Sequence, residues 1–202
     1  FVNALQWAIG LELFLLIDDP WRIFLTTDHP NGAPFTSYPR LIRLLMDRSF
    51  RKDMLATIDP DAAAASRLGS IDREYSLYEI ATMTRAAPAR SLGLKGFGSL
   101  GVGAKAHITI YKDQPNREKM FAKPEYVFKD GGIIVIDGRV VDEVWGATHV
   151  VRPEYDVGID KELDRYFDRY MTLRKDNVCV ADEEVRDNGR GKLVIHPTGS
   201  RT

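Results

Sequence analysis

Residues 22–31 constrain the fold of this chain more than any other stretch. They read Arg-Ile-Phe-Leu-Thr-Thr-Asp-His-Pro-Asn, an apolar run that turns polar and then enters a loop rich in proline and glycine. A continuous apolar run predicts a strand over residues 22–27 that is buried on both faces, as in a parallel sheet. In α/β barrels the chemistry lies where such strands end, which makes Asp28 a candidate catalytic carboxylate. The equal alternative is that Asp28 only starts a turn and His29 is merely exposed.

The composition is that of an ordinary globular protein with no strong electrostatic field. Of 202 residues, 44% are hydrophobic and 28% are charged, and the net charge of −1 does not favour nucleic acid as a partner. The single cysteine, Cys179, excludes an intrachain disulfide and favours a reducing, cytoplasmic location. Its two valine neighbours predict that Cys179 is a small buried residue.

An apolar helix is predicted over residues 4–17, close to the start of the chain. Fourteen residues are too few for a membrane span, which takes about 20, and the basic region and cleavage site of a signal peptide are missing. A helix that is apolar on all sides belongs inside a larger protein. Because the chain also lacks an initiator methionine, we expect it to be the C-terminal part of something longer.

Helices dominate the predicted structure up to Gly93. Pro39 can open a helix with one leucine-rich face, and Ser76-Leu-Tyr-Glu79 is a capping box that starts another. Pro88 is expected to end that helix and to begin a short one over residues 88–92. Two further short helices are predicted over residues 52–58 and 59–66.

Antiparallel strands are predicted after residue 93. Short alternating runs at 106–111, 126–128, 133–136 and 139–141 are separated by tight turns, two of them Asp-Gly pairs.

The tail, residues 146–202, contains an amphipathic helix that Asp160 can cap, and a last hairpin is predicted around residues 187–195. The apolar side chains of this helix predict a core or subunit contact; they are Leu163, Tyr166, Phe167, Tyr170 and Met171.

The side chains that usually carry chemistry are dispersed along the chain. His29, His107, His149 and His196 show no metal-binding spacing, and the chain has no Cys-x-x-Cys, Walker or Gly-x-Ser-x-Gly motif. A complete zinc site needs three or four ligands. Asp28 is the one good candidate that this sequence offers.

Several longer strings resemble a known family. The stretch from Gly98 to Ile110, followed by a Val/Ile-x-Asp-Gly-Arg-Val hairpin, is similar to the C-terminal end of metal-dependent amidohydrolases. The strings 6–13, 19–21, 25–31 and 70–79 resemble the A subunits of formylmethanofuran dehydrogenases and of formyltransferase/hydrolase complexes. The resemblance covers residues 3–145.

This resemblance implies a fold: an α/β protein whose complete form is a (β/α)8 barrel with a small β-sandwich. Residues 1–93 would then supply the last strand and helices of the barrel, residues 94–145 the sandwich module, and residues 146–202 a tail with the amphipathic helix.

The resemblance also implies a reaction, the hydrolysis of the N-formyl amide of a furan-type one-carbon carrier to formate, or its reverse. In the family two zinc ions activate a water, and the aspartate that ends the last barrel strand takes its proton. That aspartate matches Asp28, which the resemblance makes both the catalytic base and a metal ligand. His29 and Asn31 are weaker candidates for substrate or supporting contacts. The family's zinc-binding histidines and lysine match nothing here and would precede Phe1, so we expect this chain alone to be inactive.

The implied partners are the other subunits of such a complex and the carrier, with no nucleic acid or membrane. Two alternatives remain open at this point. The chain could be a non-catalytic assembly piece that makes contacts through the helix at 160–173. It could also come from a dihydroorotase- or hydantoinase-like amidohydrolase, against which the strings 6–13 and 25–31 count. Whether the parent is the bacterial hydrolase or the archaeal dehydrogenase is undecided by these residues.

Overall fold

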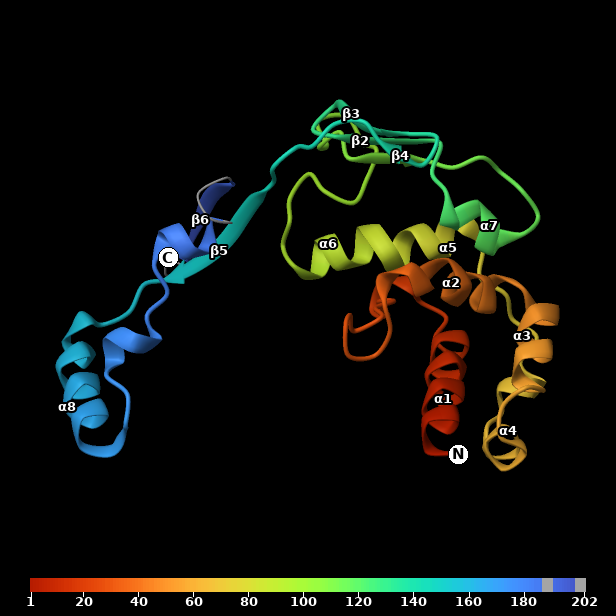
Figure 1. Cartoon of the computed structure of the whole chain (residues 1–202), viewed down its shortest axis with the longest axis horizontal. Helices are drawn as coiled ribbons and strands as arrows, with labels where there is room; N and C mark the ends of the chain where they lie inside the picture. The colour runs from red at the N-terminus through yellow and green to blue at the C-terminus, as the bar shows by residue number, and fades with distance from the viewer. Residues whose placement is uncertain (187–190, 199–202) are drawn as a thin grey trace. The chain divides into compact units, whose positions relative to one another are not determined.

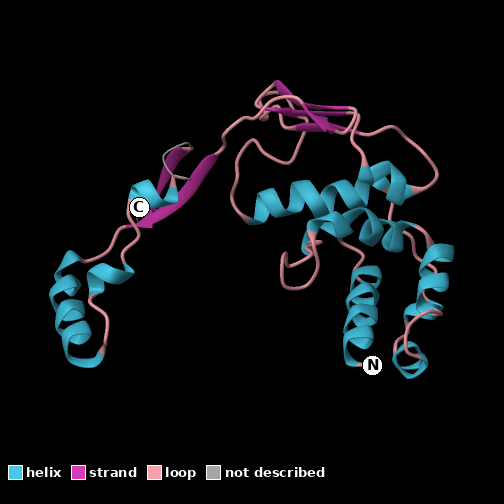
Figure 2. Ribbon diagram, viewed as in Figure 1, coloured by secondary structure: helices cyan, strands magenta, loops and turns pink. Residues whose placement is uncertain are grey.

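The computed structural model describes residues 1–186 and 191–198, and the chain divides into two compact units, Phe1–Asp142 and Glu143–Thr202. Figure 1 labels the elements, and Figure 2 shows that both units combine helices and strands. The mixed α/β class predicted from the sequence is therefore confirmed. The predicted domain boundaries at residues 93 and 145 are not tested by this division and stay predictions.

The first unit is mostly helical and ends in a small sheet. Its helices are α1 (Val2–Leu16), α2 (Tyr38–Met46), α3 (Arg48–Leu55), α4 (Pro60–Ala65), α5 (Leu77–Ala81), α6 (Ala87–Ser91) and α7 (Arg117–Ala122). Its short 3-10 turns are Pro20–Arg22, Phe35–Ser37 and Leu68–Ser70. Its strands are β1 (Ile108–Ile110), β2 (Tyr126–Lys129), β3 (Gly132–Ile136) and β4 (Arg139–Val140).

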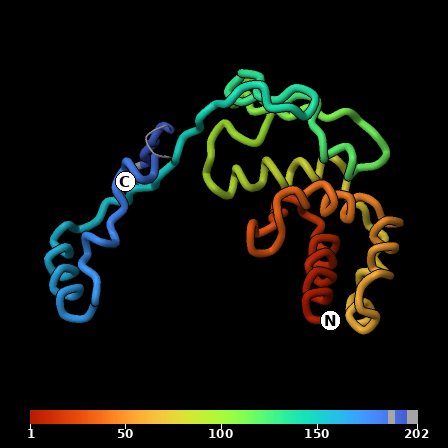
Figure 3. Tube along the Cα trace, viewed as in Figure 1, coloured from red at the N-terminus to blue at the C-terminus, as the bar shows by residue number. Residues whose placement is uncertain are grey.

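Helix α1 is apolar all round, as predicted, but the first unit covers only part of it. Ala8 and Leu15 are buried, whereas Trp7 and Leu13 on other sides are about half exposed. The end of the helix is held by Arg73, whose guanidinium donates to the carbonyl of Leu15 at 3.1 Å. Figure 3 shows α1 running beside α4, which it contacts. No helix within the described ranges has the length and apolar character needed to cross a membrane.

The core of the first unit forms where α1, α2 and α5 meet. Leu45 and Met83 are fully buried at its centre, beside Ile80 and Tyr75. One cation, Arg51, is also buried. It donates to the carbonyl oxygens of residues 44, 71 and 73 at 2.8, 3.2 and 2.9 Å, so its burial is compensated by hydrogen bonds to the backbone.

A single helical run extends from Leu77 to Ser91, because α5 and α6 are joined by a π turn over Thr82–Ala86. The prediction that Pro88 ends the first helix is therefore wrong. Proline has no N–H and its ring crowds the carbonyl four residues earlier, which the wider π turn accommodates. That carbonyl, on Thr84, accepts a hydrogen bond from the Arg85 guanidinium at 3.0 Å instead. The predicted capping box that opens the run is present.

The sheet is an antiparallel meander in the order β1-β2-β3-β4. The turns at both predicted Asp-Gly pairs have left-handed backbone, with φ of 50° at Asp130 and Asp137. The two predicted hairpins are confirmed by the antiparallel pairing of β2 with β3 and of β3 with β4. They were predictable because a tight turn of this kind depends on local chemistry. Helix α7 between β1 and β2 was not predicted, although Asn116 caps it by accepting from the Lys119 amide.

The second unit contains a two-stranded sheet whose strands are connected by a segment that contains helices. Strands β5 (Ala147–Pro153) and β6 (Lys192–Thr198) pair in parallel, so the predicted last hairpin is wrong. Its turn at residues 187–189 lies outside the described residues. Between the strands lie the 3-10 turns Val157–Ile159 and Lys175–Val178 and the helices α8 (Asp160–Tyr170) and α9 (Asp182–Val185).

Helix α8 occupies the position of the predicted amphipathic helix, but none of its residues is buried. Tyr166 and Tyr170 are 49% and 62% exposed, so the predicted core contact is not made within the described chain. Asp160 does not cap the helix. Its carboxylate accepts from the Lys175 ammonium at 3.4 Å. Cys179 is exposed rather than buried, because it follows a surface turn instead of lying in a strand.

Candidate active site

The segment that leads to the candidate carboxylate is extended, but it is not a strand of a sheet. Ile23 and Leu25 pack against the core and Thr27 is 3% exposed, whereas Phe24 between them is 41% exposed. The predicted strand over residues 22–27, covered on both faces, is therefore wrong for the described part of the chain. An extended segment becomes a strand only beside a partner that takes its N–H and C=O groups, and no partner strand lies there among the described residues.

A tight turn at the end of this segment carries Asp28. The amide of Gly32 donates to the Asp28 carbonyl at 2.9 Å, and the amide of Ala33 donates to the Thr27 carbonyl at 2.8 Å. Asp28 has left-handed backbone, with φ of 49°, and its own amide donates to the Thr26 hydroxyl at 3.2 Å. These hydrogen bonds fix the backbone on both sides of the carboxylate.

Gly32 is the residue that allows this turn to close. A Cβ atom at this position would lie 2.7 Å from the Thr27 carbonyl oxygen and 3.2 Å from the Cβ of Asp28. Any larger residue would have to push one of these groups away. The closing hydrogen bonds of the turn and the position of Asp28 therefore both depend on a glycine here.

The three predicted site residues share this one loop. Asp28, His29 and Asn31 are all exposed. The imidazole of His29 lies against the ring of Phe35, with 3.9 Å between ring centroids. The loop thus presents a carboxylate, an imidazole and an amide together on the surface of the first unit.

The loop is also tied to the helix that follows it. The Tyr38 hydroxyl, at the start of α2, donates a long hydrogen bond of 3.5 Å to the Leu25 carbonyl. Sequence reasoning missed Gly32, Phe35 and Tyr38 as residues that frame the site. A glycine four residues after an isolated aspartate was the signal that could have indicated the turn.

The described residues do not by themselves fit a metal centre. Within residues 1–186 and 191–198, no group of three or more His, Cys, Asp or Glu side chains is arranged so that it could hold a metal ion. His107 instead accepts from the Asp130 amide at 3.2 Å, and His149 contacts His196. The Asp28 carboxylate has no hydrogen-bond or ion-pair partner among these residues, which leaves it available to substrate, water or a further group.

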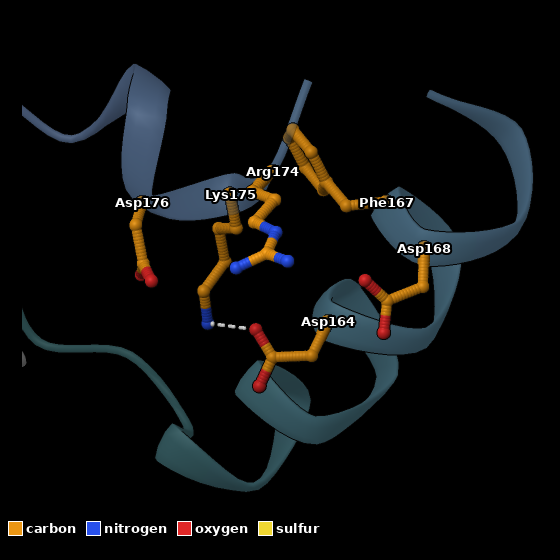
Figure 4. A pocket seen from close by; sticks show the side chains of 6 residues that line it. All are labelled: Asp164, Phe167, Asp168, Arg174, Lys175 and Asp176. Carbon is orange, nitrogen blue, oxygen red and sulfur yellow. Dashed lines mark ion pairs between the residues drawn. The ribbon is translucent and has the colours of Figure 1, made fainter. Parts of the chain in front are cut away.

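A cavity of about 350 Å3 in the second unit is lined by residues of α8 and of the turn that follows it, among them Asp164 and Lys175 (Figure 4). Lys175 reaches from its turn to α8, 2.8 Å from the Asp164 carboxylate and 3.4 Å from that of Asp160. Hydrogen bonding to Asp164 raises the pKa of Lys175 and outweighs the opposing effect of burial. These two ion pairs fasten the turn to the helix.

A second cavity, of about 370 Å3, lies in the first unit beside Trp21 and α6. The guanidinium of Arg90 lies 5.5 Å from the Trp21 ring centroid at this cavity. None of its lining residues belongs to the Asp28 turn. The loop at residues 28–31 is therefore the one place in the described chain that gathers the residues singled out by the sequence.

Comparison with known families gives one match over most of the chain. The model of the amidohydrolase family matches residues 1–141, which include the Asp28 turn and the sheet β1–β4.

Two curated relatives are similar over almost the whole chain. The A subunit of the formyltransferase/hydrolase complex Fhc of Methylorubrum extorquens is 46% identical over 187 residues, which cover 93% of this chain and 34% of that protein. Protein FwdA of Methanocaldococcus jannaschii is 44% identical over 196 residues, which cover 90% of this chain and 34% of that protein. The chain spans about a third of the length of these relatives.

A solved structure has a similar fold. The crystal structure of the formyltransferase/hydrolase complex FhcABCD from Methylorubrum extorquens, in complex with methylofuran, matches 96% of this chain and 36% of its own matched chain. The TM-score is 0.85 and the sequence identity 45%. The resemblance read from the sequence strings is confirmed by these comparisons.

Proposed function

Because this chain belongs to the amidohydrolase family, we propose that it is part of a hydrolase whose substrate is the N-formyl amide of a furan-type one-carbon carrier. The reaction releases formate, or joins formate to the carrier amine in the reverse direction. The observation that carries the proposal is the 46% identity, over 93% of the chain, to one component of a formyltransferase/hydrolase complex. The loop that presents Asp28 lies within the family match.

The proposed architecture is the last portion of a (β/α)8 barrel over residues 1–93, followed by a β-sandwich module over residues 94–145. Two features support it. Phe24 is exposed in an extended segment whose other side is in the core, as expected of a barrel strand without its neighbours. Ile133 and Ile136 on β3 are each 41% exposed, as expected of a sheet that a second sheet covers.

Asp28 is proposed as the general base of this reaction. When water attacks the formyl carbon, the carboxylate takes the proton from the water and then gives it to the amine nitrogen as the C–N bond breaks. The free carboxylate and the backbone hydrogen bonds that fix its turn support this role. His29 and Asn31 are proposed to contact substrate or to support Asp28 from the same loop.

Amidohydrolases generally depend on metal, and we propose zinc with Asp28 as one neighbour or ligand. The described residues do not supply the rest of a ligand set. The other ligands would come from the part of the longer relatives that this chain does not match. The other subunits of a cytoplasmic formyltransferase/hydrolase-type complex are the proposed partners.

A second role, as an assembly piece of such a complex, is favoured by one observation. Helix α8 is amphipathic and yet buries no residue within the described chain. A helix of this kind usually covers its apolar face with something else. This role does not exclude the first.

The decisive experiment compares substrates on the full-length protein in complex with its partner subunits. Formate release from an N-formylated furan carrier is measured beside ring opening of a dihydropyrimidine and of a hydantoin. We expect turnover of the formyl amide only. Ring opening without formate release would replace the proposal with a cyclic-amide hydrolase. If no amide were turned over, only the assembly role would remain.

A further inference from the structure

The cavity beside Trp21 in the first unit is built from three segments and shares no lining residue with the Asp28 turn. The short turn before residue 23 supplies Trp21, the helical run supplies Ala86 and Arg90, and the loop after α6 supplies residues 93–95 and 97–99. Figure 1 shows this loop leaving the end of α6 toward the sheet β1–β4. The cavity volume of about 370 Å3 lies within the range of small-molecule sites.

The loop that forms one wall of this cavity is held directly against the helix. A Cβ atom at Gly98 would lie 2.7 Å from the Arg85 carbonyl oxygen and 2.9 Å from the Cβ of Ala89. Gly98 also has left-handed backbone, with φ of 75°, so a glycine is needed for this close approach. At the start of the loop, the Leu94 amide donates to the Ala89 carbonyl at 2.9 Å. These contacts give the cavity a fixed wall.

Aromatic and aliphatic side chains line the cavity together. Trp21 is 38% exposed, and Leu94 and Phe97 are half-buried. Small-molecule sites are lined mainly by such groups, with a few polar groups that fix the orientation of the ligand. The lining therefore favours a flat apolar group such as an aromatic ring.

Two cations line the same cavity, and no acidic residue does. Arg90 and Lys95 are exposed, and neither side chain has a hydrogen-bond or ion-pair partner among residues 1–186 and 191–198. The acidic residue nearest to Trp21 in the sequence, Asp19, is paired with Arg22 at 3.2 Å. The charge of the cavity lining is therefore positive and lacks a counter-charge from its own walls.

The Arg90 guanidinium is placed so that it can still bind an anion. It lies over the Trp21 ring, 5.5 Å from the ring centroid. A guanidinium that lies over an aromatic ring uses its face for that contact. Its N–H groups lie in its own plane and stay available, in the fork that matches the two oxygens of a carboxylate.

We propose that this cavity binds a small aromatic carboxylate, whose charge is held by Arg90 and Lys95. Its ring packs against Trp21, Leu94 and Phe97. A simple inorganic anion would leave the apolar walls uncovered, and a neutral aromatic compound would leave both cations without a counter-charge. A ligand that combines a ring with a carboxylate satisfies both parts of the lining. This site is independent of the proposed hydrolase function.

The test is equilibrium dialysis of radiolabelled phenylacetate against the full-length protein in complex with its partner subunits. We expect saturable binding of one phenylacetate per chain. Arg90→Gln should weaken this binding at least about tenfold, because a charge-assisted bond is lost. The matched control is Arg22→Gln, which lies next to Trp21 but does not line the cavity and should keep the affinity. Asp28→Asn should also keep it, which separates this site from the catalytic loop.

Competition experiments test the class of ligand. Acetate has the charge without the ring, and benzyl alcohol has the ring without the charge. We expect each to displace phenylacetate at least about tenfold less effectively than unlabelled phenylacetate does. Equal displacement by acetate would reduce the cavity to a simple anion site, and equal displacement by benzyl alcohol would show that the cations make no contribution. Either result would overturn the proposal.

A second measurement locates the site without relying on the folding of a variant. The unchanged protein in its complex is labelled with 4-azidobenzoate, a photoreactive aromatic carboxylate, and the labelled peptides are mapped by mass spectrometry. We expect the label at Trp21 or within residues 86–99, and excess phenylacetate should prevent it. Label confined to other segments, no saturable binding, or an unchanged affinity in Arg90→Gln would overturn the proposal.

Discussion

The amide of Gly32 donates to the carbonyl of Asp28 at 2.9 Å, which closes the turn that presents the Asp28 carboxylate. The next hydrogen bond, from Ala33 to Thr27, fixes the residue before the carboxylate at 2.8 Å. The side chain itself has no partner among the described residues. The chain therefore holds the backbone of Asp28 firmly and leaves its oxygens available.

Replacement of Asp28 tests its role as the base. In the full-length protein within its complex, Asp28→Asn should lower the rate of formate release by at least about 10²-fold, because an amide cannot accept the proton. Metal content, measured by elemental analysis, should stay largely intact. Asp53→Asn on the exposed side of α3 is the control and should keep normal turnover. A near-normal rate in the Asp28 variant would show that Asp28 is not the general base.

Replacement of Gly32 tests whether the turn positions Asp28. Gly32→Ala should reduce formate release and lower the free energy of unfolding by about 1–3 kcal/mol, because the added Cβ collides with the Thr27 carbonyl. Gly10→Ala is the matched control, since a Cβ there meets nothing within 4 Å and a helix gains about 0.5–1 kcal/mol from the change. Denaturant unfolding of both variants decides the point. Equal stability of the two would show that the turn tolerates a side chain.

Glu79 should make the stability of the first unit depend on pH. Burial alone would raise the pKa of Glu79, but hydrogen bonds from the Ser76 amide, Arg73 and the Ser76 hydroxyl outweigh it and hold the pKa below its usual value. The unfolded chain therefore binds this proton more readily. The stabilisation is complete above the usual pKa of about 4.3 and is lost as pH falls through the lower folded value.

Denaturant unfolding between pH 7 and pH 3 measures this contribution. Glu79→Gln should cost about 1 kcal/mol at pH 7 and should show a smaller loss of stability on acidification than the unchanged protein. Glu154→Gln, at an exposed position of the second unit, should leave the curve of the first unit unchanged. An identical acid slope in the Glu79 variant would contradict the expected contribution.

The isolated chain of 202 residues should bind no stoichiometric zinc and release no formate. The reason is that no group of three or more candidate ligands within the described residues is arranged so that it could hold a metal ion, whereas a zinc site takes three or four. Elemental analysis after dialysis against zinc, together with a formate assay, makes the measurement. One tightly bound zinc per chain, lost in Asp28→Asn, would show that the ligand set is complete here.

Local chemistry alone predicted several elements of this protein. The capping box Ser76–Glu79, the Asp-Gly hairpins and the apolar helix α1 were predictable because their determinants are neighbours in the sequence. The grouping of Asp28, His29 and Asn31 was equally local. The sequence motifs at residues 6–13, 19–21, 25–31 and 70–79 also indicated the likeness to amidohydrolases. Motifs of this length identify a family from the sequence alone.

Tertiary structure decided what depends on partners far away in the chain. The segment at residues 23–27 has the pattern of a strand, but it has no neighbour to pair with among the described residues. Strand β6 pairs in parallel with β5 rather than in the predicted hairpin, which alone brings His149 and His196 together. The physical reason is that a strand's free energy comes from its neighbour's hydrogen bonds and side chains, and the sequence of one segment does not specify that neighbour.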